Sequence, residues 1–385
     1  MKKTMEQRTA LAQARRIVVK IGSRVLVQRN GRPDLARLKA LVKDLAKLRR
    51  ESREVVVVSS GAIGTGVFTL GLKQRPTSLP DLQMAAAVGQ SRLMALYDRL
   101  FAAEKCRVGQ VLLTHADLKE RQRHLNARNT MMNLLRHGIV PIVNENDVVA
   151  VDEIKFGDND LLASLVAMLI QANLLILLTT VDGLRAPAAA GRTRRVPFLQ
   201  GVDHESLALA VGKGSELSTG GMASKLQAAD AVAGIGTPVV IANGRTPGVL
   251  GRILAGADIG TLIATGRAAD LTGRKRWIGY FHKAQGALVV DEGARKAVAE
   301  KGRSLLPIGI KAVEGEFAAG AVVNIRTAEG GAFARGVVDY SSADLRRIQG
   351  LHSHEVAALL GSPDYEEVIH RDNMVVLNGR AGETV

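Results

Sequence analysis

The sequence predicts an α/β fold with a mostly parallel sheet, followed by a smaller β-rich domain. Two observations lead to this prediction. Over the first two thirds of the chain, short apolar runs rich in Val, Ile and Leu alternate with helical patterns, which is typical of a parallel sheet covered by helices. In the last third, short alternating strands follow one another with only brief helices between them.

Five apolar runs are the predicted strands of the first domain, and each runs into Gly, Ser, Thr or Asn. They cover residues 16–22, 54–61, 108–115, 138–147 and 172–180. Continuous apolar runs suit strands buried on both faces. Helices are predicted over 34–51, 78–104 and 224–236. In the first of these, one apolar stripe recurs at helical spacing and consists of Leu35, Leu38, Leu41, Val42, Leu45 and Leu48.

The change in pattern near "LTGRKRWIGYFHKAQG" marks the predicted domain boundary. We expect one domain over residues 1–275 and a β-rich domain over 284–365. Strands in the second domain are predicted at "ALVVDEG", "GIKAVEG", "AVVNIRTAEG" and "AFARGVVDY". Residues 185–195, "RAPAAAGRTRR", are predicted to form a flexible basic loop.

Composition points to a globular protein of the cytoplasm. Hydrophobic residues make up 46% of the chain, which is ample for a core. Cys106 is the single cysteine, so no intramolecular disulfide can form, and the charged start has no apolar stretch of a signal peptide. The apolar run 161–181 is interrupted by Gln171-Ala172-Asn173, so we expect a buried helix and a buried strand there and no membrane span.

The net charge of +15 is unevenly distributed. Residues 276–385 carry 13 Lys and Arg against 14 Asp and Glu, so the basic excess belongs to the first domain. Nucleic acid, anionic substrates and phosphates are all candidate partners of such a surface, and a solvated basic surface is the plainer interpretation. Because nucleic-acid binding draws on Lys and Arg, the charge of the second domain argues against an RNA-binding role.

Polar residues follow several predicted strands. In parallel sheets ligands bind at the carboxyl ends of the strands, and this rule places Lys20, Ser59-Ser60-Gly61, Asn144–Asp147 and Thr179-Thr180 along one rim. Each cluster also has a plain structural reading. Lys20 would be a snorkelling surface lysine, and one residue of Asp158-Asn159-Asp160 would be a helix N-cap.

A third cluster, "STGGMASK" at 218–225, does not fit the P-loop pattern. Gly220 and Gly221 allow backbone N–H groups to approach an anion at a helix start, with Lys225 one turn into that helix. The plain reading is a glycine loop beside a solvated lysine. Two lysines, a glycine anion site and an aspartate able to tether both lysines are together the equipment for phosphoryl transfer.

The order of these motifs resembles the amino acid kinase family. The motifs are "VVKIGS", "VVVVSSGAIGTG", "PIVNEND", "KFGDNDLLAS", "ILLTT" and "STGGMASKLQAA". The resemblance implies a three-layer sandwich, and residues 274–278, 288–294 and 303–310 resemble a PUA domain. It implies the branch of the family that phosphorylates the γ-carboxylate of L-glutamate with ATP to give L-glutamyl 5-phosphate, the first step of proline biosynthesis.

The resemblance also implies roles for individual residues. Lys20 and Lys225 match catalytic lysines, and Asp160 matches the aspartate that orients them. The positions that match glutamate binding are Ser60, Asp147 and Asn159, with Asn144 and Gly61 nearby. The positions that match ATP binding are Lys20, Thr179, Thr180, Thr219, Gly220, Gly221, Met222, Ala223, Ser224 and Lys225. No residue matches a protein metal ligand, so Mg²⁺ is expected to arrive with ATP.

One stretch departs from the family pattern. The family usually has Asp at the position of Thr180, although Asp182 is present in this chain. The family also usually has a Gly-Leu-Tyr sequence, and Arg185 replaces its Tyr. This segment borders the adenosine end in the family, so the departure concerns nucleotide affinity or base preference.

Two other functions stay open at this point. In the first alternative, the chain is an RNA-binding protein with a PUA domain. In the second, it is a family member that phosphorylates aspartate, N-acetylglutamate or a nucleotide. Asp147 favours an acceptor with a free amino group. The resemblance further implies a homo-oligomer, a dimer or a tetramer, and a functional link to glutamate-5-phosphate reductase.

Overall fold

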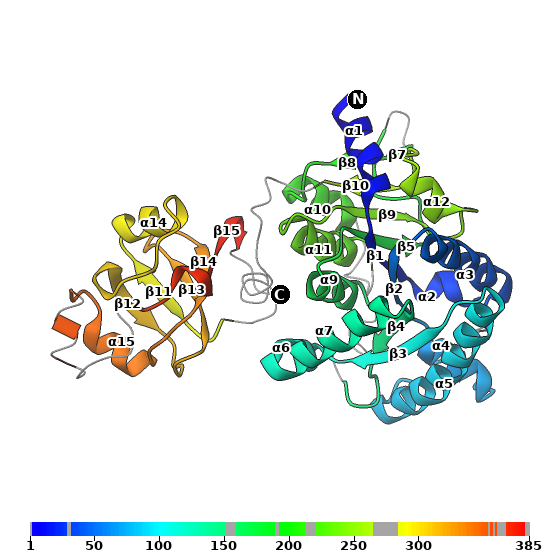
Figure 1. The fold of residues 1–385 in the computed structure, drawn as a ribbon, viewed down its shortest axis with the longest axis horizontal. Coiled ribbons are helices and arrows are strands. Elements are labelled where there is room, and N and C mark those ends of the chain that lie inside the picture. The colour runs from blue at the N-terminus through cyan, green and yellow to red at the C-terminus, as the bar shows by residue number, and fades with distance from the viewer. Residues whose placement is uncertain are drawn as a thin grey trace. The chain divides into compact units, whose positions relative to one another are not determined.

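The computed structural model describes residues 2–28, 32–150, 159–188, 192–211, 221–264, 284–352, 355–356, 359 and 367–381. The chain divides into two compact units, Met1–Ala269 and Asp270–Val385 (Figure 1). Because residues 265–283 lie outside the described ranges, the predicted domain bounds 1–275 and 284–365 stay predictions.

The first unit is built on a sheet with the strand order β3-β4-β2-β1-β5-β9-β10-β8. The six strands from β3 to β9 are parallel, whereas β10 runs antiparallel to β9 and parallel to β8. The strands are β1 (Arg16–Ile21), β2 (Glu54–Val58), β3 (Val108–Leu113), β4 (Val140–Glu145), β5 (Leu174–Thr179), β8 (Phe198–Leu199), β9 (Val239–Asn243) and β10 (Thr261–Ile263).

Helices cover both faces of this sheet. The helices are α1 (Lys2–Ala10), α2 (Ser23–Leu26), α3 (Leu35–Arg50), α4 (Ala62–Thr69), α5 (Leu79–Ala103), α6 (His115–Lys119), α7 (Arg121–Arg136), α9 (Asp160–Leu169), α10 (His204–Val211), α11 (Met222–Ala233) and α12 (Val249–Leu254), with the 3₁₀ turn η1 (Leu11–Gln13). One core cluster joins α3, α5 and α12 to the sheet face that carries Ile17, Val19 and Ile21. Helices α9 and α11 lie against each other on the opposite side, so the predicted three-layer arrangement is confirmed (Figure 1).

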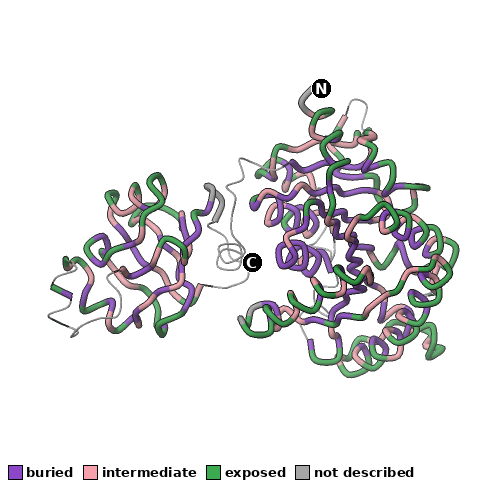
Figure 2. The backbone as a smooth tube through the Cα atoms, viewed as in Figure 1, coloured by how far each residue is buried: buried purple, intermediate pink, exposed green. Residues whose placement is uncertain are grey.

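The five predicted strands are confirmed as β1 to β5. Strands β1, β2, β4 and β5 are buried on both faces, as the central strands in Figure 2 show, whereas β3 lies at the edge of the sheet and is partly exposed. The predicted helices are confirmed as α3, α5 and α11. In α3 the side chain of Asp34 caps the first turn by accepting a hydrogen bond from the Arg37 N–H. Leu35 is the exception in the predicted apolar stripe, because it lies in the first turn and is 46% exposed.

The apolar run 161–181 is divided as predicted. It forms the buried helix α9 and the buried strand β5, and the Gln171-Ala172-Asn173 break lies between them. Of the helices in the described ranges, none has both the length and the apolar character that crossing a bilayer would require.

The second unit contains a five-stranded sheet with the order β12-β11-β13-β14-β15. Its elements are β11 (Ala287–Val290), α14 (Glu292–Ala299), η3 (Pro307–Gly309), β12 (Ile310–Glu314), β13 (Val322–Arg326), β14 (Ala332–Val337), α15 (Ser342–Ile348), η4 (Arg371–Asn373) and β15 (Met374–Ala381). The four predicted strands are β11 to β14. The sequence analysis missed β15, which pairs with β14 beyond residue 365.

Candidate active site

A buried lysine–aspartate–lysine cluster lies at the carboxyl ends of the parallel strands. Lys20 is near the end of β1, and its Nζ lies 2.8 Å from Oδ1 of Asp160. The Nζ of Lys225 lies 2.8 Å from Oδ2 of the same carboxylate. Lys20 is fully buried, Asp160 is 1% exposed and Lys225 is 5% exposed. The plain readings of both lysines as surface residues are therefore wrong.

Two helix starts position this cluster. Asp160 is the first residue of α9, and Lys225 lies in the first turn of α11. The two helices are joined where the Ser164 hydroxyl donates a 2.8 Å hydrogen bond to the Ala228 carbonyl. The cluster carries two positive charges against one negative charge, so a net positive charge faces whatever binds there. Such a site suits an anion.

The first turn of α11 adds backbone donors beside Lys225. Gly221 is the N-cap and provides no side chain, so the first N–H groups of α11 have no side-chain cap. Met222, Ala223 and Ser224 follow in this turn. The Ser224 hydroxyl lies 3.2 Å from Oδ2 of Asp160. The predicted residues Asp158, Thr219 and Gly220 lie outside the described residues.

On one side of the cluster, Asn159 connects the ends of two strands, β2 and β4. Its Nδ2 donates hydrogen bonds of 2.6 Å to the Ser59 carbonyl and to Oδ1 of Asn144. Asn144 in turn donates to Gln90 of α5 at 2.7 Å. Asn159 stands at the N-cap position of α9 but makes no side-chain cap hydrogen bond. One of the three residues therefore occupies the N-cap position, as the plain reading predicted, but its side chain bonds to Ser59 and Asn144 and does not cap the helix.

Ser60 and Gly61 lie on this side too, between β2 and α4. Ser60 is 8% exposed, and among the described residues its hydroxyl oxygen has no hydrogen-bond partner. Gly61 is the N-cap of α4 with a φ of 90°, a left-handed conformation that favours glycine. The turn thus presents an unpartnered hydroxyl beside a helix start.

Asp147 and Glu145 place two carboxylates on the same side. Asp147 is 9% exposed and Glu145 is 3% exposed. Burial and, as a smaller cause, the neighbouring charge of Glu145 raise the pKa of Asp147 to about 6, and the charge of Arg75 opposes the shift. A carboxyl group with this pKa is mostly ionised at neutral pH and gains from a nearby cation.

On the other side of the cluster lie Thr179 and Thr180, both half-buried, at the end of β5. Beyond them the Asp182 carboxylate pairs with Arg185 at 2.8 Å. The prediction of a flexible loop over 185–195 is wrong for its described residues. Segments β6 (Arg185–Pro187) and β7 (Thr193–Arg195) pair as antiparallel strands, stabilised by hydrogen bonds from Arg185 to Thr193.

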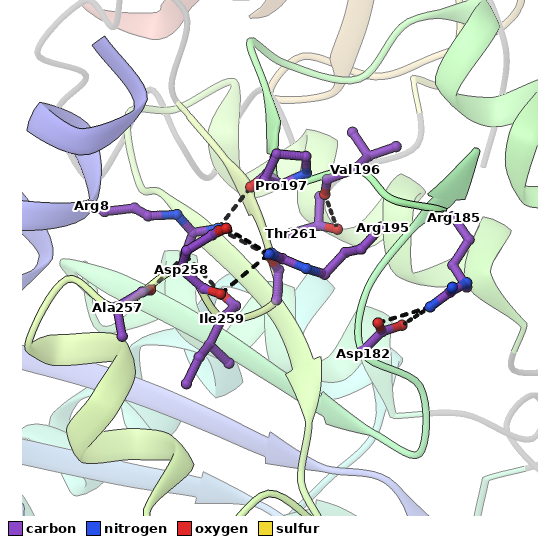
Figure 3. A network of polar contacts seen from close by, with 11 residues as sticks. Arg8, Asp182, Arg185, Arg195, Val196, Pro197, Ala257, Asp258, Ile259 and Thr261 are labelled. Atoms are coloured by element: carbon purple, nitrogen blue, oxygen red, sulfur yellow. Dashed lines mark hydrogen bonds and ion pairs between the residues drawn. The ribbon is translucent and has the colours of Figure 1, made fainter. Parts of the chain in front are cut away.

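Arg8, a buried arginine of α1, holds together the segments that precede β8 and β10 (Figure 3). Arg8 is 3% exposed and donates hydrogen bonds to four backbone carbonyls, those of Pro197, Ala257, Ile259 and Gly260. It also pairs with Asp258 at 3.1 Å, and Arg195 pairs with the other oxygen of that carboxylate at 2.8 Å. This network fixes the starts of β8 and β10.

The network reaches the segment after Thr180 through Thr261. The Thr261 hydroxyl donates to the Val196 carbonyl at 2.6 Å and accepts from the Leu184 N–H at 2.9 Å. A side chain at Gly183, whose φ is 136°, would meet the Thr261 hydroxyl. Residues 183–188 and 192–197 are thus anchored on β10, three strands away from Lys20.

The described ranges contain no group of three or more His, Cys, Asp or Glu side chains that could hold a metal ion. Both oxygens of Asp160, the acid nearest the lysines, lie within 2.8 Å of a lysine nitrogen. These side chains therefore fit a metal ion that is held mainly by a bound small molecule.

Sequence reasoning missed three polar residues of this region. Glu145 stands inside the recognised motif "NEND" but was given no role, although buried acids are informative. Gln90 lies in the middle of α5, and nothing in its local pattern marks it. Arg8 lies in an N-terminal helix with little apolar periodicity, so the sequence shows no reason for its burial.

Comparison with known proteins supplies the family. Residues 15–243 match the model of the amino acid kinase family, and residues 286–360 match that of the PUA domain. A glutamate 5-kinase of Moorella thermoacetica is 46% identical over 97% of this chain and 99% of its own length. The glutamate 5-kinase of Gloeobacter violaceus is 49% identical over 94% of this chain and 99% of its own. This chain therefore belongs to the amino acid kinase family and carries a C-terminal PUA domain.

Proposed function

We propose that the enzyme transfers the γ-phosphoryl group of ATP to the γ-carboxylate of L-glutamate, giving L-glutamyl 5-phosphate, the first step of proline biosynthesis. The observation that carries this proposal is the pair of buried lysines on one aspartate carboxylate, with unpartnered polar groups on one side. The near full-length identity to proteins named glutamate 5-kinase supports it.

The acceptor needs no general base. A γ-carboxylic acid with a pKa of roughly 4.3 is already ionised at neutral pH. The obstacle is the approach of one anion to another. Lys20 and Lys225 offset that repulsion and stabilise the charge that moves with the phosphoryl group. Asp160 holds both ammonium groups in place, because each of its oxygens lies 2.8 Å from one of them.

L-glutamate is assigned to the side with Ser60, Asn144 and Asp147. Asp147 offers a carboxylate to the α-ammonium group, and Ser60 and Asn159 offer hydrogen bonds to the amino-acid end of the substrate. Gly61 lets the chain turn closely at the start of α4. Asn144 orients Asn159 through the 2.6 Å hydrogen bond.

ATP is assigned to the opposite side. In-line transfer requires donor and acceptor on opposite sides of the moving phosphoryl group. With glutamate over β2 and β4, the nucleoside extends over β5 and β9, past Thr179 and Thr180 and toward the anchored residues 183–188 and 192–197. The backbone of residues 221–224 and Lys225, with Thr219 and Gly220 before them, would line the phosphates. Mg²⁺ carried by the phosphate oxygens would supply further charge neutralisation.

The predicted partners and location rest on family resemblance and composition. We infer a homo-oligomer, a dimer or a tetramer, that acts in the cytoplasm. The acyl phosphate product is reactive, which fits a functional link to glutamate-5-phosphate reductase, the enzyme class that consumes it.

A coupled assay of ADP release across L-glutamate, L-aspartate, N-acetylglutamate and UMP tests the proposal. We expect the highest kcat/KM with L-glutamate. The highest kcat/KM with any other acceptor would overturn the assigned substrate.

The RNA-binding alternative is tested separately on a chain that ends near Lys275. We expect this truncated enzyme, once shown to be folded and monodisperse, to phosphorylate glutamate, because every proposed site residue precedes residue 226. A folded truncation without kinase activity would place part of the site in the second unit. Tight, sequence-selective RNA binding by the isolated second unit at physiological salt would favour the alternative.

A further inference from the structure

Glu145 is a buried acid to which the proposed mechanism gives no role. It is the last residue of β4 and is 3% exposed. Its Oε1 has no hydrogen-bond partner among the described residues. Buried carboxylates are normally paired, because an uncompensated charge in the interior is costly. A buried acid without a counter-charge at a ligand site indicates that the ligand brings the counter-charge.

The neighbouring acid strengthens this point. Asp147 lies two residues further on and is 9% exposed, and its pKa is raised first by burial and second by the charge of Glu145. Arg75, an exposed residue before α5, offsets that repulsion only in part. The two lysines of the site serve the other end, since both are held by Asp160.

Within the part of the chain that the structure describes, two further atoms without hydrogen-bond partners lie on the same side. They are the Ser60 hydroxyl oxygen and Oδ1 of Asn159. The amide oxygen and the two carboxylates are acceptors, and the hydroxyl oxygen can accept as well as donate, so this side presents mainly acceptors and negative charge. A primary ammonium group has three donors and one positive charge, which matches that set.

We propose that Glu145 determines specificity: with Asp147, it recognises the free α-ammonium group of the amino-acid acceptor and disfavours acceptors without that charge. This inference rests on the proposed function, because it concerns the substrate of that same site. A glutamine at position 145 would fill the same space without like-charge repulsion. A purely structural role therefore gives no reason for the carboxylate.

The test compares two acceptors in the full-length enzyme. L-glutamate carries the ammonium group, and glutarate has the same carbon chain and carboxylates without it. ADP release is measured for the wild type, for Glu145→Gln, and for Glu6→Gln as a control that removes an exposed carboxylate on α1. The KM for ATP is measured alongside.

We expect Glu145→Gln to raise the KM for L-glutamate roughly tenfold, the effect of losing one charge-assisted interaction. The kcat and the KM for ATP should stay within about twofold, because the lysine cluster is untouched. The kcat/KM for glutarate should be unchanged or higher. The preference for L-glutamate over glutarate therefore falls roughly tenfold, whereas Glu6→Gln leaves it unchanged.

An unchanged preference overturns the inference, and so does an equal loss with both acceptors. Glu145→Asp keeps the charge and should retain most of the preference, and a loss as large as that of Glu145→Gln would contradict the charge argument. A Glu145→Gln enzyme that does not fold overturns the inference too, because it would show that the carboxylate is needed for the structure. If the wild type releases no ADP with L-glutamate, the proposed function itself fails.

Discussion

The two ends of the candidate site differ in how their charges are balanced. At the phosphate end, Lys20 and Lys225 share the Asp160 carboxylate, and further along the sheet Arg8 and Arg195 share the carboxylate of Asp258. At the acceptor end, Glu145 and Asp147 are buried carboxylates for which the described residues offer no ion pair, and the Ser60 hydroxyl has no partner.

This difference separates positioning from recognition. Groups that are already paired are held in place before the ligand binds, which suits the stabilisation of charge in a transition state. Groups left without partners at a buried site are costly in the free enzyme, and the cost is recovered only when a ligand of matching charge binds. We therefore expect changes at the phosphate end to affect kcat, and changes at the acceptor end to affect glutamate affinity.

The largest expected effect is at the phosphate end. Lys225→Ala should lower kcat by on the order of 10²-fold or more, because the lysine charge is used mainly in the transition state. The KM for glutamate should change far less. Steady-state kinetics with both substrates varied provides the measurement. Lys47→Ala on α3, whose lysine is 68% exposed, is the matched control. Near-normal kcat in Lys225→Ala would show that the assigned role is wrong.

The Arg8 network is expected to have the next largest effect, on stability. Arg8→Ala removes four hydrogen bonds to backbone carbonyls and leaves those carbonyls buried, so we expect a loss of about 2–4 kcal/mol in the free energy of unfolding. Arg185→Ala breaks the exposed pair with Asp182 and should cost at most about 1 kcal/mol. Urea unfolding of both variants measures the difference. Equal losses would contradict a structural role for Arg8.

At the acceptor end, Asp147→Asn keeps the shape and removes the charge. The KM for glutamate should rise roughly tenfold to a hundredfold, as expected for one charge-assisted interaction of about 1.5–3 kcal/mol. The KM for ATP should stay nearly constant. An unchanged glutamate KM would remove Asp147 from the substrate site.

The same variant should be more stable than the wild type at high pH. The folded state raises the pKa of Asp147 from 3.8 to about 6, so it binds the proton more tightly than the unfolded state does. This contribution favours folding below pH 3.8 and is lost as the pH rises through about 6. Asp147→Asn should therefore gain at most about 3 kcal/mol at pH 8, and roughly half of that at pH 5. Chemical unfolding at both pH values checks the gain.

The sequence predicted the long strands of the sheet better than the short strands at the edge formed by β10 and β8. The runs that became β1, β2, β4 and β5 are mostly apolar, so burial on both faces could be inferred from them. Strands β8 and β10 have two and three residues, too few for a periodic signal. The residue before β10, Gly260, accepts a hydrogen bond from Arg8, which lies about 250 residues away in the chain. Local patterns carry no information about such a contact.

In the site, the motif residues and the tethering of two lysines by one aspartate were predicted, but the other side-chain contacts were not. The sequence suggested that one aspartate could tether both lysines, and the structure gives each Asp160 oxygen one lysine. Glu145 was given no role in the sequence analysis. Its importance depends on its burial and on the absence of a counter-charge among the described residues, and the adjacent residues in the sequence predict neither. The hydrogen bonds of Asn159 to Ser59 and Asn144 likewise depend on the strand order β4-β2-β1.

The most direct test of the contrast between the two ends is the number of protons released when L-glutamate binds the enzyme without nucleotide. It is measured by titration calorimetry in buffers of different ionisation enthalpy. At pH 6 about half of the Asp147 carboxyls hold a proton, and the arriving ammonium group should expel it, so roughly half a proton is released per site. At pH 8, and in Asp147→Asn, we expect almost none. Binding without proton release at pH 6 in the wild type would contradict the claim that the Asp147 carboxylate pairs with the ammonium group of the substrate.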